Sequence, residues 1–243
     1  MKERANRDQI ILATKGGGPT GVQEIDTSKA HMIQSVEKSL KRLQTDYIDL
    51  YYTHYDDEKT PVEETLEAYA ELIKAGKIRH VAVSNMSPDR IQASFEASEK
   101  LGLPKFQALQ PLYNLVERQG YEALYAPIAE KYGLSVFPYA ALAQGFLSGK
   151  YRSEADLGKS VRGGGLKKYL EGNGLSVLDA IDQVSKKHDA TPTTVSLAWL
   201  LAQPHVDAPI VSATSKEQLN SLLAAPQLVL DQHDLSLLDS ASK

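Results

Sequence analysis

The chain has 243 residues, of which 42% are hydrophobic and 24% charged, a composition that excludes disordered and fibrous proteins. Its 31 acidic and 27 basic residues give a net charge of −4, which argues against a nucleic-acid partner. The absence of cysteine excludes disulfides, thiolate catalysis and cysteine-based metal sites. No stretch approaches the roughly 18 apolar residues of a membrane span. The N-terminal MKERANRDQ lacks the apolar core of a signal peptide, so we expect a cytoplasmic protein without a membrane partner.

Short β-rich runs alternate with longer amphipathic segments along the whole chain. The predicted strands cover residues 10–14, 47–53, 78–83, 106–109, 134–138 and 208–212. The first predicted helix follows a cap at Thr27 or Ser28 and carries apolar residues at Ile33, Val36, Leu40 and Leu43. The other predicted helices cover residues 61–75, 88–101, 120–132, 175–188, 191–202, 216–224 and 233–238. Residues 140–174 are predicted as a long polar loop rich in glycine.

This alternation predicts an α/β protein with a parallel sheet built from six βα units. No linker divides the chain, so we expect a single domain over residues 1–243. An open dinucleotide-binding sheet would carry GxGxxG after its first strand, and Gly16-Gly17-Gly18-Pro19 does not match that spacing. A TIM-barrel-like fold explains better why the strands end in polar residues, because barrel enzymes place their chemistry at the carboxyl ends of the strands.

The polar residues at the predicted strand ends are the main functional signal in the sequence. They are Lys15, His54, Ser84 with Asn85, Gln110, Tyr139 and Ser212. A Lys and a His at adjacent strand ends suit proton chemistry at a carbonyl, whereas either residue alone is also explained as a solvated residue of the barrel rim. Amide side chains at a barrel mouth can hold a carboxamide, and a tyrosine there can stack on a flat ring or simply pack.

Two further features have a structural and a functional interpretation. Ser87 followed by Pro88 is typical of a helix start with Ser87 as the N-cap. The adjacent carboxylates Asp56 and Asp57 could suggest a metal, but such pairs in a loop more often cap a helix. No combination of histidines and carboxylates has convincing metal-ligand spacing, so we expect no metal site.

Several stretches, in order, resemble the aldo-keto reductase family over essentially the whole chain. They are ATK at 13–15, SLKRLQTDYIDLYYTH at 39–54, AGKIRHVAVSN at 75–85, LQPLYNL at 109–115, YAALAQGFLSGKY at 139–151, SLAWLLAQP at 196–204 and PIVSATSKEQL at 209–219. The resemblance implies a (β/α)8 barrel that reduces aldehydes or ketones, its small-molecule substrates, with NADPH by direct hydride transfer.

The resemblance also implies roles for individual residues. Lys15 and His54 match the catalytic lysine and histidine of the family. The residues implied at the cofactor are Ser84, Asn85 and Gln110 at the nicotinamide carboxamide, Tyr139 on its ring, Leu142, Gln144, Gly145, Lys150 and Arg162 at the pyrophosphate, and Ser212, Thr214, Lys216 and Gln218 at the adenosine phosphate. A basic residue that the family commonly places near Ser212 is missing, so NADP(H) is expected with NAD(H) as the alternative.

The chain departs from the family at its N-terminus. No residue matches the family's catalytic Asp and Tyr, and MKERANRDQIILATK resembles the end of the second helix and the third strand of the barrel. We therefore expect a domain that is incomplete at the N-terminus, with the first two βα units missing. The alternatives to an active reductase are a catalytically inactive nucleotide-binding or regulatory member of the family and a non-functional truncated product.

Overall fold

A computed structural model describes residues 6–19, 24–160 and 163–243. Within these residues, five strands form one sheet in the order β1-β2-β3-β4-β5. The backbone divides into two compact units, Met1–Gln110 with Ile128–Ser135, and Pro111–Pro127 with Val136–Lys243. Each unit is described below by itself.

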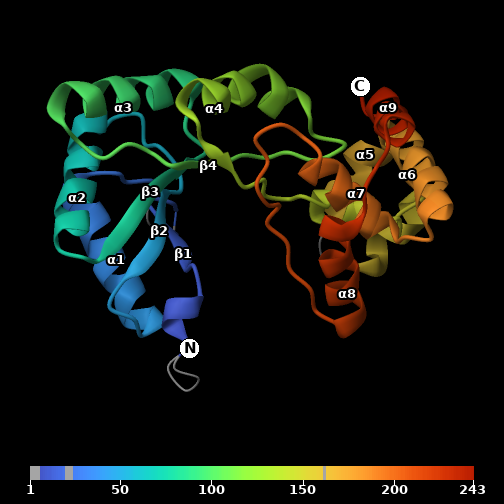
Figure 1. Cartoon of the computed structure of the whole chain (residues 1–243), viewed down its shortest axis with the longest axis horizontal. Coiled ribbons are helices and arrows are strands. Elements are labelled where there is room, and N and C mark those ends of the chain that lie inside the picture. The colour runs from blue at the N-terminus through green and yellow to red at the C-terminus, as the bar shows by residue number, and fades with distance from the viewer. Residues whose placement is uncertain (1–5, 20–23, 161–162) are drawn as a thin grey trace. The chain divides into compact units, whose positions relative to one another are not determined.

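The first unit is a run of strand–helix pairs. Its elements are β1 (Ala13–Gly16), α1 (Lys29–Leu43), β2 (Ile48–Thr53), α2 (Val62–Lys74), β3 (Ile78–Ser84), α3 (Pro88–Leu101) and β4 (Ala108–Gln110), after a short 3-10 helix at Arg7–Gln9. Neighbouring strands from β1 to β4 pair in parallel, which requires the helical crossovers that the sequence supplies. Figure 1 shows α1, α2 and α3 beside these strands.

Alternation along β2 gives the sheet two different faces. Tyr51 and Thr53 point to the helices, where the Thr53 hydroxyl lies 2.6 Å from the hydroxyl of Tyr69 in α2. The rings of Tyr51 and Tyr69 meet edge to face at 6.4 Å. Because side chains alternate along a strand, Tyr52 points to the opposite face. Its register partner on β1 is Lys15, so both residues face the same side of the sheet.

Two helix starts in this unit are capped in different ways, one by a local residue and one by a residue of another helix. Ser87 caps α3 as predicted, because its hydroxyl accepts from the Arg90 N–H and Pro88 follows at the first helical position. Ser28 occupies the N-cap of α1, but its side chain makes no capping bond. The Lys29 N–H donates instead to the carboxylate of Glu64 in α2, at 3.0 Å.

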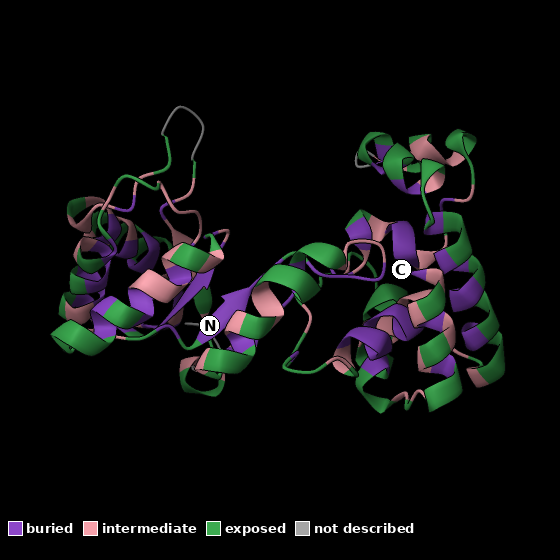
Figure 2. Ribbon diagram, turned by 90° about the horizontal axis from the view of Figure 1, so that it is seen from above, coloured by how far each residue is buried: buried purple, intermediate pink, exposed green. Residues whose placement is uncertain are grey.

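The second unit is mainly helical. Its elements are three 3-10 helices at Ala143–Ser148, Glu154–Lys159 and Gly163–Leu166, then α5 (Lys167–Glu171), α6 (Gly174–His188), α7 (Pro192–Leu201), α8 (Lys216–Ala224), a 3-10 helix at Ala225–Gln227 and α9 (Gln232–Ala241). A π-helical turn at Tyr121–Tyr125 precedes α4 (Ala126–Tyr132), and α4 and β5 (Ser135–Val136) each contribute residues to both units. In Figure 2, helices of both units carry buried residues on one face and exposed residues on another.

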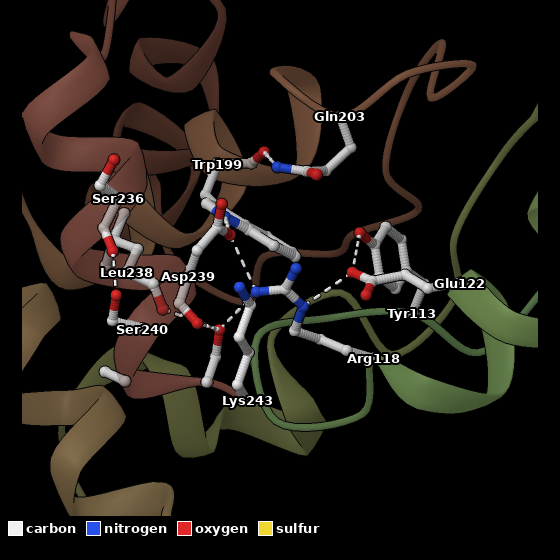
Figure 3. Close-up of polar contacts among 12 residues, drawn as sticks. Tyr113, Arg118, Glu122, Trp199, Gln203, Ser236, Leu238, Asp239, Ser240 and Lys243 are labelled. Carbon is white, nitrogen blue, oxygen red and sulfur yellow. Dashed lines mark hydrogen bonds and ion pairs between the residues drawn. The ribbon is translucent and has the colours of Figure 1, made fainter.

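Arg118 connects segments of the second unit that lie far apart in the sequence. Its guanidinium donates to Glu122 at 2.7 Å, to Asp239 of α9 at 2.8 Å and to the Ser242 hydroxyl at 2.6 Å. The indole N–H of Trp199, in the buried α7, donates to the same Asp239 carboxylate at 3.0 Å (Figure 3). One arginine thus holds the segment after β4 against α7 and the C-terminal helix.

The predicted α/β class with parallel strands is confirmed, and the described sheet is open. The helices predicted at 88–101 and 216–224 match α3 and α8. The strand predicted at 208–212 is wrong. That segment forms one backbone hydrogen bond to the sheet region, from the Ile210 N–H to the Pro138 carbonyl at 2.8 Å, and Pro209 has no N–H to extend a ladder.

The long loop predicted at 140–174 is also wrong in part. The described residues of this segment form the three 3-10 helices and α5. Phe146, Leu147, Tyr151 and Leu166 are completely buried there. Glycine here accompanies short, bent helices, because Gly145 kinks the first 3-10 helix with a φ of 99° and Gly149 ends it with a φ of 80°.

No helix in the described part of the chain has the length and apolar character of a membrane span.

Candidate functional site

The candidate site of the first unit lies at the carboxyl ends of β1 to β4. The register pairs Lys15 with Tyr52 and Ser84 with Gln110. His54 follows Tyr52 by two positions, so alternation places it toward the same side as Tyr52. The structure therefore brings Lys15, His54, Ser84 and Gln110 to one face at one edge of the sheet, as the strand ends predicted.

Lys15 is half-buried and has no carboxylate partner among the described residues. Its ammonium group lies 5.2 Å from the ring centre of Tyr52. Burial lowers the pKa of Lys15 below its ordinary value, since the charged form loses solvation. This side chain is thus a cation held against an aromatic ring.

His54 is positioned through its backbone and its ring. Its N–H donates to the Gly16 carbonyl at 2.8 Å, and its carbonyl accepts from the Asn85 side-chain amide at 2.9 Å. Gly18 lies so close to the ring that a Cβ there would meet Nδ1 of His54 at 2.5 Å. Burial, and then the charge of Lys15, lower the pKa of His54, so the neutral imidazole predominates at neutral pH.

Ser84, Asn85 and Gln110 form a hydrogen-bonded group beside His54. The Ser84 hydroxyl donates to the Gln110 carbonyl at 2.8 Å, and the Asn85 amide donates to the Ser84 hydroxyl at 3.1 Å. Asn85 adopts a φ of 47°, which asparagine tolerates better than most residues. Ser84 and Gln110 are 1% and 5% exposed, so their polar groups are held in fixed positions.

Tyr52 is a site residue that the sequence reasoning missed. It is 2% exposed, its ring lies under Lys15, and its hydroxyl interacts with the Gln110 side chain. Burial raises the pKa of Tyr52 to about 12, and the contact with Gln110 partly offsets this. The signal that could have found it is alternation, because the residue two positions before a strand-end histidine faces the same side of the sheet.

In the second unit, three of the predicted pyrophosphate residues, Leu142, Gln144 and Gly145, lie in one tight turn. Gln144 and Gly145 both adopt the left-handed conformation, with φ of 57° and 99°. The Gly145 N–H donates back to the Leu142 carbonyl at 2.8 Å, and Gly145 lies against the Lys150 side chain. Tyr139 lies just before this turn, where its N–H donates to the Pro111 carbonyl at 2.9 Å.

The residues predicted at the adenosine phosphate gather at the start of α8. The Thr214 N–H and hydroxyl both donate to the Gln218 side chain, at 2.9 and 3.1 Å. Lys216 is the first residue of the helix and Ser212 precedes this group by two positions. All four side chains are exposed. Arg162, the remaining predicted residue, lies outside the described residues.

The carboxylates after His54 organise their own loop. Asp56 forms a two-bond ion pair with Arg90, at 2.7 and 2.8 Å. The Asp57 carboxylate accepts hydrogen bonds from the backbone N–H groups of Thr27, Lys59 and Thr60. The prediction that this pair caps a helix is wrong, since Pro61 is the N-cap of α2 and no side chain caps it. In the described part of the chain, no cluster of three or more His, Asp or Glu side chains could hold a metal ion.

Comparison with known proteins identifies the family. The model of the Aldo/keto reductase family matches residues 1–243. This chain belongs to the aldo/keto reductase family. It is 35% identical to the aldo-keto reductase YhdN of Bacillus subtilis over 245 residues, which cover 96% of this chain and 70% of that protein. It is 31% identical to the L-glyceraldehyde 3-phosphate reductase of Escherichia coli K12 over 248 residues, or 97% of this chain and 70% of that enzyme. The aldo/keto reductase family consists of oxidoreductases with a TIM-barrel fold, as the resemblance of the motifs implied.

Proposed function

We propose that this protein binds a nicotinamide dinucleotide and reduces aldehydes or ketones to alcohols. The observation that carries this proposal is the arrangement of Lys15, His54, Ser84 and Gln110 at the carboxyl ends of adjacent parallel strands. In barrel enzymes this edge of the sheet carries the chemistry. Family membership adds that the chain is an oxidoreductase.

The polar groups at this edge fit the nicotinamide cofactor. A carboxamide needs one donor and one acceptor, and the buried side-chain amide of Gln110, which also contacts the Tyr52 hydroxyl, carries both kinds of group. In the second unit, Lys150 beside the left-handed turn at Gly145 and Lys216 at the start of α8 supply positive charge suited to phosphates. When bound, the reduced cofactor supplies a hydride. NADP(H) is the proposed cofactor, and NAD(H) is the alternative.

His54 and Lys15 are proposed to act on the carbonyl oxygen. The neutral imidazole of His54 can donate a hydrogen bond that fixes the orientation of the carbonyl. The ammonium of Lys15 places a positive charge at the same edge, where it stabilises negative charge that develops on oxygen. Both groups are held in place by the backbone contacts of β1 and β2.

A second candidate function is nucleotide binding without rapid turnover. The observation that favours it is that this chain is 30% identical, over 92% of its length, to a putative voltage-gated potassium channel subunit beta of Schizosaccharomyces pombe. The two candidates share the cofactor site and differ in whether an aldehyde is reduced.

Two measurements test the proposal. NADPH and NADH are first titrated against the protein by cofactor fluorescence. NADPH oxidation is then followed by absorbance with an aromatic aldehyde, for the parent and for His54→Ala, with His233→Ala at an exposed position of α9 as the control. Turnover that falls about 10²-fold or more in His54→Ala and persists in His233→Ala supports the reductase. Binding without turnover supports the second candidate, and absence of binding contradicts both.

A further inference from the structure

Asp57 connects the loop after β2 to the segment that precedes α1. Its carboxylate accepts a hydrogen bond from the backbone N–H of Thr27, 30 residues earlier, at 2.9 Å. It also accepts the Lys59 N–H at 3.0 Å, the Thr60 N–H at 2.8 Å and the Thr60 hydroxyl at 2.7 Å. Each carboxylate oxygen thus accepts two hydrogen bonds, and one of these four bonds joins segments that are distant in the sequence.

Thr27 is held at both ends of its backbone. Its N–H donates to Asp57, and its carbonyl accepts a hydrogen bond from the hydroxyl of Thr65 in α2 at 2.8 Å. The residue is only 1% exposed. Its hydroxyl makes no hydrogen bond within the described part of the chain. The side chain of Thr27 therefore contributes packing, and its position is set by the bonds of its backbone.

The methyl group of Thr27 lies against the glycine turn that follows β1. A Cβ at Gly17, whose φ is 79°, would meet Cγ2 of Thr27 at 3.1 Å. The next residue, Gly18, lies so close to His54 that a Cβ there would meet Nδ1 of the ring at 2.5 Å. Contacts therefore run from Asp57 through Thr27 and the two glycines to the imidazole of His54.

We propose that Asp57 is a positioning residue for His54. By fixing the backbone of Thr27, its carboxylate holds Gly17 and Gly18 against the imidazole and so sets the orientation of the ring. The inference rests on the proposed function, in which His54 orients the substrate carbonyl. Asp57 acts there through its neighbours and does not contact the reacting atoms.

NMR of the imidazole nitrogens tests this geometry on the full chain without nucleotide. The six histidines are labelled with nitrogen-15, and the variant His54→Gln identifies the signals of His54. In Asp57→Ala we expect the Nδ1 and Nε2 signals of His54 to shift, because the glycines that contact the ring lose their support. The signals of His233, at an exposed position of α9, are expected to stay.

Asp49→Asn is the control for a general loss of stability. Asp49 lies near the amino end of β2, and its carboxylate likewise accepts a backbone N–H from another segment, that of Leu12 at 2.9 Å. Its substitution is expected to lower the urea midpoint and to leave the signals of His54 in place. A carboxylate that only stabilises this unit would give the same result at both positions.

Steady-state kinetics with NADPH and an aldehyde give the functional readout. In Asp57→Ala we expect kcat to fall about 10- to 10²-fold, because a catalytic group is displaced. The KM for NADPH is expected to stay within about twofold of its parent value, because the cofactor residues are unchanged. Asp57→Asn, which keeps one acceptor oxygen, should recover part of the loss, and Asp49→Asn should leave kcat unchanged.

Two variants of Thr27 test the path to the ring without removing the carboxylate. Thr27→Val keeps a methyl group against Gly17 and replaces the hydroxyl that has no hydrogen bond within the described residues. Thr27→Ser removes the methyl group and keeps the backbone bonds. We expect the signals of His54 to shift in Thr27→Ser and to stay in Thr27→Val.

Unmoved signals of His54 in Asp57→Ala, an equal shift in Asp49→Asn, or equal positions of these signals in the two Thr27 variants overturn the proposal. If Asp57→Ala does not fold, the pair of Thr27 variants decides. The spectra require no nucleotide, so a parent protein without NADPH binding or turnover would contradict the proposed function and leave this test intact.

Discussion

Gly18 lies against the ring of the strand-end histidine, and a single methyl group there would change the site. A Cβ at position 18 would approach Nδ1 of His54 to 2.5 Å, and the imidazole would have to move. We predict that Gly18→Ala lowers kcat/KM for aldehyde reduction about 10²-fold, since displacement of a catalytic group by about 1 Å costs that much. Steady-state kinetics with NADPH measure the effect.

The matched control for this change is Gly120→Ala. A Cβ at Gly120 meets no atom within 4 Å, and its φ of −60° suits alanine. Gly120→Ala should leave the kinetics unchanged. Urea unfolding of both variants separates displacement of His54 from general loss of stability, and full activity in Gly18→Ala would contradict the assigned position of the ring.

At the scale of one element, the 3-10 helix Gly163–Leu166 offers a comparison of two adjacent glycines. A Cβ at Gly163 would collide with the backbone carbonyl of Leu157, whereas a Cβ at Gly164 meets nothing within 4 Å. We predict that Gly163→Ala lowers the free energy of unfolding by about 1–3 kcal/mol, because backbone must shift to admit the methyl group. Gly164→Ala should change it by less than about 0.5 kcal/mol.

Urea denaturation followed by circular dichroism measures both glycine variants. Equal stabilities of Gly163→Ala and Gly164→Ala would show that the close approach to Leu157 does not constrain the fold.

The elements that were predictable from sequence are those whose pattern is local. The strand predicted at 47–53 and the Ser87-Pro88 start of α3 depend on neighbouring residues, and both predictions hold. The strand predicted at 208–212 has a suitable local pattern, but a strand also needs a partner with matching hydrogen bonds, and Pro209 supplies no N–H.

The same distinction applies to the candidate site. His54 and Lys15 were found because each ends a strand and matches a family motif. Tyr52 was missed because its importance depends on cross-strand register with Lys15 and on a contact with Gln110, which a single sequence does not display. The prediction that Asp57 caps a helix was wrong, because one of the hydrogen bonds that its carboxylate accepts comes from Thr27, 30 residues earlier, and a single sequence does not display such a contact.

At the scale of the whole molecule, carboxylates of both units favour the folded state only when they are ionised. Although burial raises the pKa of Asp49, the Leu12 N–H and Arg7 lower it overall. Burial also raises the pKa of Asp234, but hydrogen bonds from Lys187 and His188 lower it overall. An unfolded aspartate has a pKa of about 3.9. The pKa values of Asp49 and Asp234 in the folded protein lie below this unfolded value. The stabilisation that these carboxylates give is therefore present above about pH 4 and is lost as the pH falls through their folded pKa values.

We therefore predict that the urea midpoint falls modestly from about pH 7 to 5, because the unfolded state protonates His54 more readily than the folded state does, and falls steeply below about pH 4. Asp49→Asn should lower the midpoint at pH 7 and flatten its pH dependence. Asp46→Asn, at an exposed position after α1, is the control and should do neither. Urea titrations by circular dichroism at several pH values measure these effects, and an unchanged pH profile in Asp49→Asn would contradict this account.

The contacts of Arg118 have a consequence for the order of events during synthesis. Asp239 lies 121 residues after Arg118, so at 5–20 residues per second it leaves the ribosome about 6–24 s later. During that interval the guanidinium lacks Asp239 and Ser242, and Trp199, which is made 40 residues before Asp239, lacks the acceptor of its indole N–H for the last third of it. Trp199 is the single tryptophan of the chain and is fully buried when α9 is in place, so its fluorescence would report the moment at which the nascent C-terminal helix docks.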